Sequence, residues 1–110
     1  MANLGEFEQL ILFSVLQLED EAYGLAIRER IEERTGRAAS AGAIYTTLGR
    51  LESRGLVASR TEARATGGPG RPRKLYRLRP DGARALQDAY TTIQKMAGGT
   101  LSKLSELAEG

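Results

Sequence analysis

The chain reads SAGAIYTTLGRLESRGLVASRT over residues 40–61 and KLYRL over residues 74–78. The first segment opens with a serine, which is a favourable N-cap, and its apolar positions Ile44, Leu48 and Leu51 follow at helical spacing. Two short alternating segments then flank a stretch rich in glycine and proline, a pattern typical of a β-hairpin with a long loop. This order of helix, strand, loop and strand predicts the second half of a winged helix-turn-helix.

Two further helices are predicted upstream, over Glu6–Leu18 and Ala22–Arg34. The second is amphipathic and ends at Gly36, as expected of a C-cap glycine. The first is apolar almost all the way round, so it needs cover on more than one side, from the domain's own core and from a partner subunit. The helix after Ser40 is predicted over Ala41–Arg54, and the two strands over Leu56–Thr61 and Lys74–Leu78.

A last helix is predicted from Pro80 towards the C-terminus, because proline is acceptable in a first helical turn. Its apolar positions recur at steps of three and four, with the register shifting at Gly98-Gly99. Two adjacent glycines cost about 2 kcal/mol of helix propensity relative to alanines, so a break or kink is expected there.

Composition narrows the range of functions. A chain of 110 residues has room for one domain and a modest core. It contains no cysteine and no histidine, so thiolate or imidazole metal sites, the common nucleophile systems and disulfides are all excluded. Carboxylate pairs such as Glu32-Glu33 suit a solvated helix face better than acid/base chemistry. No enzyme activity, metal site or cofactor is predicted.

Charge is unevenly distributed along the chain. The net charge is only +2, yet residues 60–79 hold seven basic residues against one acidic residue, and the remainder is net acidic. A basic segment on an acidic body indicates a localised contact with a polyanion. Neither a signal peptide nor a membrane helix is predicted, so the expected location is the cytoplasm, at the nucleoid when the protein is bound to DNA.

A set of short motifs is spread along the chain: LGEFE at 4–8, Tyr23-Gly24, GAIYTTL at 42–48, Arg50-Leu51-Glu52, Gly55-Leu56-Val57, RKLYRL at 73–78 and Pro80-Asp81-Gly82. In type and spacing these motifs resemble the PadR family of bacterial transcriptional regulators. The resemblance covers nearly the whole chain. It implies a dimer built from the first and last helices, a third helix in the major groove, and a wing on the flanking backbone or minor groove. Family members usually repress, and some release DNA when a small aromatic compound binds.

This chain departs from the family pattern in two respects. Arg79 stands where the family often has a threonine before the proline of the last helix, which removes a helix cap. The C-terminal region is short, as in the smaller members, so a large effector-binding domain is not expected.

The predicted DNA-binding residues lie on the third helix, at the head of the second helix and on the hairpin. Small residues at the start of the third helix allow close approach to a groove, and Gly-Arg-Pro at 70–72 is similar to peptides that insert an arginine into a narrow minor groove. Tyr45 packing under the wing, Arg50 being merely solvated and Tyr23 serving only as a packing residue stay open as alternatives. Tyr76 and Leu78 are predicted to be core. The full DNA-binding set is Tyr23, Ser40, Gly42, Tyr45, Thr46, Arg50, Arg71, Arg73 and Lys74.

The predicted dimer contacts lie on the first and last helices: Phe7, Leu10, Phe13, Leu86, Tyr90, Ile93, Leu101 and Leu104. The surplus apolar surface near Phe13 could also line a pocket for a small hydrophobic or aromatic effector, although packing is the simpler use.

Together these patterns predict a mostly α fold with a small β-hairpin, divided into a winged helix-turn-helix at residues 1–79 and a C-terminal dimerisation helix at residues 80–110. The predicted function is a homodimeric transcriptional regulator, a repressor that binds a pseudo-palindromic operator in double-stranded DNA. The alternative is a winged helix used for protein contact without DNA specificity.

Overall fold

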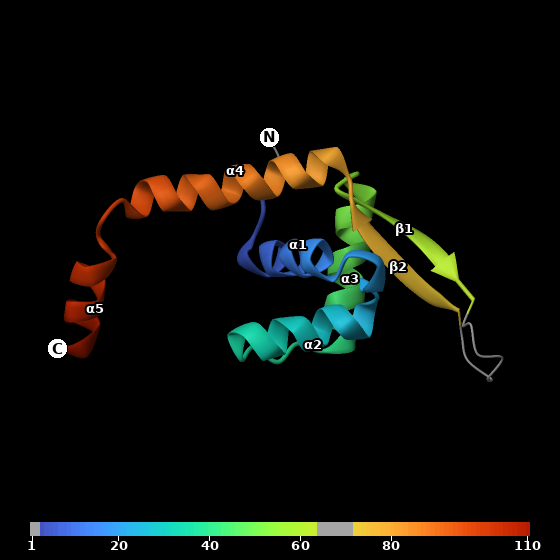
Figure 1. Ribbon diagram of the computed structural model, residues 1–110, viewed down its shortest axis with the longest axis horizontal. Helices are drawn as coiled ribbons and strands as arrows, with labels where there is room; N and C mark the ends of the chain where they lie inside the picture. Colours follow the sequence, from blue (N-terminus) through green and yellow to red (C-terminus); the bar gives the residue numbers. More distant parts are fainter. Residues whose placement is uncertain (1–2, 64–71) are drawn as a thin grey trace.

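The computed structural model describes residues 3–63 and 72–110 (Figure 1). It is mostly helical, with one two-stranded antiparallel hairpin, which confirms the predicted fold class. The elements in chain order are α1 (Glu6–Leu18), the short 3-10 helix η1 (Glu19–Glu21), α2 (Gly24–Thr35), α3 (Ala41–Ser53), β1 (Val57–Glu62), β2 (Arg73–Leu78), α4 (Pro80–Ala97) and α5 (Leu101–Glu109). No helix within the described ranges is long and apolar enough to cross a membrane.

Local signals account for most of the helix ends. The Ser40 hydroxyl accepts a hydrogen bond from the Ala43 amide at 3.0 Å, which caps α3 as predicted. Gly36 ends α2 in the left-handed region, at a φ of 75°. Arg79 precedes α4 without a side-chain cap, in agreement with the missing threonine. Short-range hydrogen bonding therefore sets the start of α3 and the end of α2.

The predicted start of α2 at Ala22 is wrong. The helix begins at Gly24, because Tyr23 is extended and the backbone of both Ala22 and Tyr23 pairs with β2. The Tyr76 amide donates to the Ala22 carbonyl at 2.8 Å, and Tyr23 forms an isolated antiparallel bridge with Leu75. These backbone bonds hold Ala22 and Tyr23 beside β2, outside the two-stranded hairpin.

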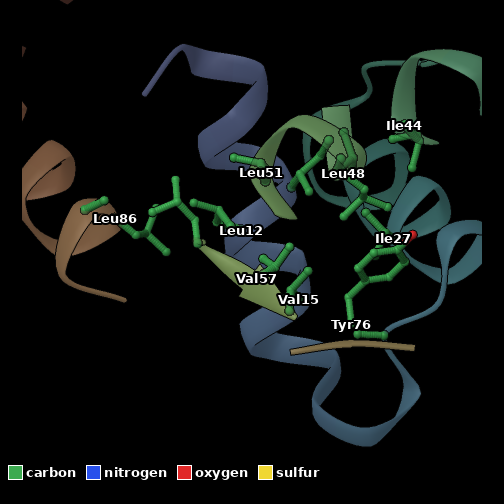
Figure 2. Close-up of a cluster of buried hydrophobic side chains, with 14 residues drawn as sticks. Leu12, Val15, Ile27, Ile44, Leu48, Leu51, Val57, Tyr76 and Leu86 are labelled. Atoms are coloured by element: carbon green, nitrogen blue, oxygen red, sulfur yellow. The ribbon is translucent and has the colours of Figure 1, made fainter. Parts of the chain in front are cut away.

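The core is centred on α1, with side chains from the surrounding elements packed around it (Figure 2). Ile11 and Leu12 of α1 are fully buried, together with Ile27 of α2. The core side chains labelled in Figure 2 are Leu12, Val15, Ile27, Ile44, Leu48, Leu51, Val57, Tyr76 and Leu86. They come from six elements, the helices α1, α2, α3 and α4 and the strands β1 and β2, so one core unites the helices and the hairpin.

Successive β2 residues are buried on both faces of the hairpin. Tyr76 is buried as predicted, and Leu78 is partly buried against the core. Leu75, one position away and therefore on the opposite face, is also buried, at 4% exposure. The alternating pattern did not predict this second buried position, which lies beside the paired Tyr23.

The helix α4 begins in the core and then leaves it (Figure 1). Its first turns bury Gly82, Ala85 and Leu86, whereas no residue of α5 is buried. The glycine pair at 98–99 separates the two helices, which confirms the expected break. The Cα radius of gyration is 16.4 Å, compared with about 13 Å for a compact chain of this length. The C-terminal arm thus extends beyond the domain; the division at residue 79 stays a prediction.

Candidate nucleic-acid interface

The N-terminal half of α3 presents an uncovered face made mostly of small side chains. Ile44, Thr47, Leu48 and Leu51 point into the protein, leaving the remaining positions outside. The exposed residues on or next to this face are Ser40, Ala41, Gly42, Tyr45, Thr46, Gly49 and Arg50. Short side chains let a helix approach the floor of a groove closely, as recognition helices do. Gly49 belongs to this face but was not in the predicted set.

Ser40 has a structural role as the α3 cap. Its oxygen already accepts from Ala43, and a hydroxyl keeps one proton to donate as well as a second acceptor lone pair. The residue is exposed, so that proton can reach a phosphate oxygen. Capping and DNA contact are therefore compatible at this position.

Tyr45 packs against the head of α2 while remaining half exposed. A Cβ built on Gly24 would lie 2.4 Å from both Cζ and the hydroxyl of Tyr45, so the ring occupies the space that a side chain at 24 would need. The exposed fraction of Tyr45 is 51%, which leaves part of the ring free on the outer surface. Tyr45 thus packs α3 against the start of α2. Sequence patterns did not identify Gly24 as the residue whose missing side chain makes room for this ring.

The side chains of Tyr23 and Arg73 form a second contact at the head of α2. The Arg73 guanidinium carbon lies 4.5 Å from the centroid of the Tyr23 ring, within the range of a cation–π interaction. The Arg73 Nε is buried and has no hydrogen-bond partner among the described residues. Arg73 and Tyr23, predicted separately as DNA contacts, are therefore in contact with each other.

The hairpin carries further basic side chains. Lys74 and Arg77 are exposed, and Lys74 lies opposite Thr61 in the register. Arg60 is paired with Glu62 at 2.7 Å, so part of its charge is already neutralised. Lys74 is accordingly the predicted hairpin residue that is most available to a phosphate. The predicted contact at Arg71 lies outside the described residues.

The N-terminus of α3 and the outer end of the hairpin lie on one side of the subunit, away from α4 (Figure 1). Figure 1 shows α3 and both strands running away from α4, so the α3 N-terminus and the Glu62–Arg73 end of the hairpin lie opposite that helix. The described residues contain no cluster of acidic or histidine side chains suited to a metal ion. This side of the subunit thus combines the start of an exposed helix, α3, with one basic strand, β2.

The sequence and this fold agree with one family. The model of the PadR-like family of transcriptional regulators matches residues 12–88, which include every element from within α1 to the middle of α4. The chain belongs to the PadR-like family.

Two proteins similar to this PadR-like chain match over most of their length. Transcriptional regulator Rv3488 of Mycobacterium tuberculosis is 33% identical over 90 residues, which span 82% of this chain and 79% of that protein. The crystal structure of a PadR family transcriptional regulator from Eggerthella lenta has a TM-score of 0.68 at 30% identity, covering 90% of this chain and 86% of that one.

A third similarity is to the crystal structure of Bacillus subtilis PadR in complex with operator DNA. The TM-score is 0.62 at 24% identity, with 76% of this chain and 47% of that chain covered. At this identity the comparison shows a shared fold.

The PadR-like chain also has an apolar surface away from α3. Tyr90, Ile93, Leu101 and Leu104 are each at least half exposed, as are Met96 and Leu107, which were not in the predicted dimer set. Phe7, Leu10 and Phe13 are partly buried against the core, and Phe13 meets Tyr90 edge to face at 5.9 Å between ring centroids.

Leu86 differs from the other predicted dimer contacts. It is only 4% exposed in the single subunit because the start of α4 packs in the core. Its side chain is thus already covered without a partner. The heptad spacing that predicted a dimer contact here coincides with burial within the subunit, and the dimer contact itself stays a prediction.

Proposed function

We propose that this PadR-like regulator binds operator DNA as a homodimer and represses transcription from it, in the cytoplasm and at the nucleoid. The observation that carries the proposal is that the N-terminus of α3, whose outer positions are exposed, and the outer end of the hairpin lie on the same side, away from α4 (Figure 1). The fold is shared with a PadR whose crystal structure is a complex with operator DNA. In this arrangement α3 enters the major groove and Lys74 meets the backbone beside it.

The C-terminal arm supports the homodimer. Six large apolar residues of α4 and α5 are at least half exposed on one subunit: Tyr90, Ile93, Met96, Leu101, Leu104 and Leu107. Together they form more apolar surface than a monomer usually presents to water. A second copy covers this surface, and the resulting twofold symmetry requires a pseudo-palindromic operator with matching half-sites.

Relief of repression by a small hydrophobic or aromatic compound is part of the proposal. A groove of about 240 Å³ lies between α1, β2 and α4, with Phe13, Leu78 and Tyr90 among its lining residues. Its walls are mainly apolar and it borders the surface assigned to the partner. A compound bound there would act on the dimer geometry that sets the half-site spacing.

The DNA-binding proposal is tested by selecting duplexes from a random library and measuring fluorescence anisotropy on selected and unselected DNA. We expect the selected duplex to bind at least tenfold more tightly, and Thr46→Ala to reduce this ratio because it removes a groove contact. Lys74→Ala should weaken both duplexes alike, because it removes a phosphate contact. Lys103→Ala on α5 is the control with the same loss of charge. It should change neither the affinity for the selected duplex nor the affinity for the unselected duplex.

Equal affinity for selected and unselected duplexes would contradict an operator-specific role. Absence of binding even at low salt would favour the alternative of a winged helix used for protein contact.

A further inference from the structure

The Arg73 side chain is engaged within the subunit. Its guanidinium carbon lies 4.5 Å from the Tyr23 ring centroid, and its Nε is buried. Glu62, opposite Arg73 in the hairpin register, pairs with Arg60 at 2.7 Å. No ion pair to Arg73 is present among the residues that the structure describes. The Tyr23 ring is therefore its principal partner in the free protein.

The backbone joins the same two segments beneath this contact. Tyr23 bridges Leu75, and the Tyr76 amide donates to the Ala22 carbonyl at 2.8 Å. On the other side of Tyr23, Gly24 supports the Tyr45 ring of α3. A continuous set of contacts thus runs from the hairpin through the head of α2 to the exposed face of α3.

We infer that Arg73 is a positioning residue, which fixes the hairpin against α2 by covering Tyr23 and so sets the distance between Lys74 and the α3 face. This inference rests on the DNA binding proposed above. It gives Arg73 a different role from the groove contact that the Gly-Arg-Pro sequence predicts. The buried Leu75 and Tyr76 anchor the rest of β2 in the core, so the stack of Arg73 on Tyr23 acts on the direction of the hairpin's outer end, where β2 begins.

Hydrogen exchange in the free protein tests the contact without DNA. The Tyr76 amide is the probe, because its bond to Ala22 must break when the hairpin separates from α2. Arg73→Ala should speed its exchange about two- to fivefold, the factor expected from losing a cation–π contact near the surface. Tyr23→Ala should do the same and Tyr23→Phe should not, because it keeps the ring. Lys74→Ala, the neighbouring loss of charge, should leave the exchange rate unchanged.

Salt dependence of DNA binding then separates positioning from phosphate contact. Lys74→Ala should reduce the slope of log K against log salt by about 0.9 for each subunit, because one phosphate contact is lost. Arg73→Ala should weaken binding about two- to fivefold with the slope unchanged, and the Tyr23→Ala, Arg73→Ala double variant should bind no more weakly than either single variant.

The inference is overturned if Arg73→Ala behaves as Lys74→Ala does, with unaltered Tyr76 exchange and a reduced salt slope. If the wild-type protein fails to bind any duplex, the proposed function fails, while the exchange rates still decide whether Arg73 holds the hairpin.

Discussion

Gly24 makes room for the Tyr45 ring at the α3 face, because the ring occupies the place that a Cβ at position 24 would take. We expect Gly24→Ala to lower the free energy of unfolding by about 1 kcal/mol, since the half-exposed Tyr45 ring must move away from its place on α2. Chemical denaturation measures this change. Adding Tyr45→Ala should recover part of the loss by removing the clash.

Gly49→Ala is the matched control for that substitution. Gly49 also lies in a helix, but nothing is within 4 Å of the position of its Cβ. Alanine there should raise the free energy of unfolding by about 0.5–1 kcal/mol, through helix propensity alone. Equal effects of the two substitutions would show that Tyr45 does not rest on Gly24.

Tyr76 makes the stability of the fold sensitive to alkaline pH. Burial raises the pKa of its hydroxyl above the ordinary value of 10.0, and the nearby Glu52 and Tyr45 raise this pKa further. The folded state therefore holds the proton more tightly than the unfolded state. The stability from this group is complete below pH 10 and is lost as pH rises through the folded pKa. Tyr76→Phe should reduce the loss of denaturation free energy above pH 10; an identical alkaline loss in both proteins would contradict this.

The sequence predicts single residues well where the cause is local. Ser40 is recognisable as a cap because its hydroxyl bonds an amide three residues away. The pairing of Arg73 with Tyr23 joins positions 50 residues apart in the chain, and no local spacing signals it. The burial of Leu75 was missed for the same reason, because the segment beside it precedes α2.

At the scale of elements, Gly82 determines how α4 joins the core. A Cβ at this position would lie 2.0 Å from the Leu56 carbonyl oxygen, which is backbone and cannot rotate away. We expect Gly82→Ala to cost about 3 kcal/mol or more in the free energy of unfolding, because α4 must move. Gly42→Ala is the control, since its Cβ would meet nothing closer than 3.9 Å. A small effect of Gly82→Ala in thermal and chemical denaturation would contradict this docking.

Helix boundaries show which elements sequence patterns can predict. The α1 bounds agree with the predicted Glu6–Leu18, and the break between α4 and α5 falls at the predicted glycine pair. The α2 start differs by two residues, because pairing with a strand 50 residues later in the chain overrides the local helical pattern of Ala22 and Tyr23. Helix propensity and capping thus determine where a helix begins, unless a backbone hydrogen bond to a distant segment of the chain competes with them.

For the whole molecule, the exposed leucines of α5 point to a role in assembly. Ending the chain at Gly98 should leave the domain folded, because α5 buries no residue. The dissociation constant of the proposed homodimer should rise on the order of tenfold or more, because the apolar side chains of α5 are no longer there to be buried against the partner. Sedimentation equilibrium measures the change against twice the chain mass of 11.9 kDa.

Single substitutions in α5 sharpen the same test. Leu104→Gln places an amide on the apolar side of α5 and should weaken the dimer, whereas Ser102→Gln is the control on the polar side. A dimer as strong as that of the wild-type protein in both Leu104→Gln and the truncated chain would show that the arm has no part in assembly.

Hydroxyl-radical footprinting of the wild-type dimer on its selected duplex tests most directly that α3 and the hairpin share one DNA-facing side of a twofold molecule. A twofold dimer with this DNA-facing side should protect two half-sites on one face of the duplex, with centres about one helical turn, 10–10.5 base pairs, apart. Each protected half-site should extend outward into the flanking DNA backbone, and Lys74→Ala should remove this flanking protection. A single protected segment bound by a monomer, or half-sites on opposite faces of the duplex, would contradict it.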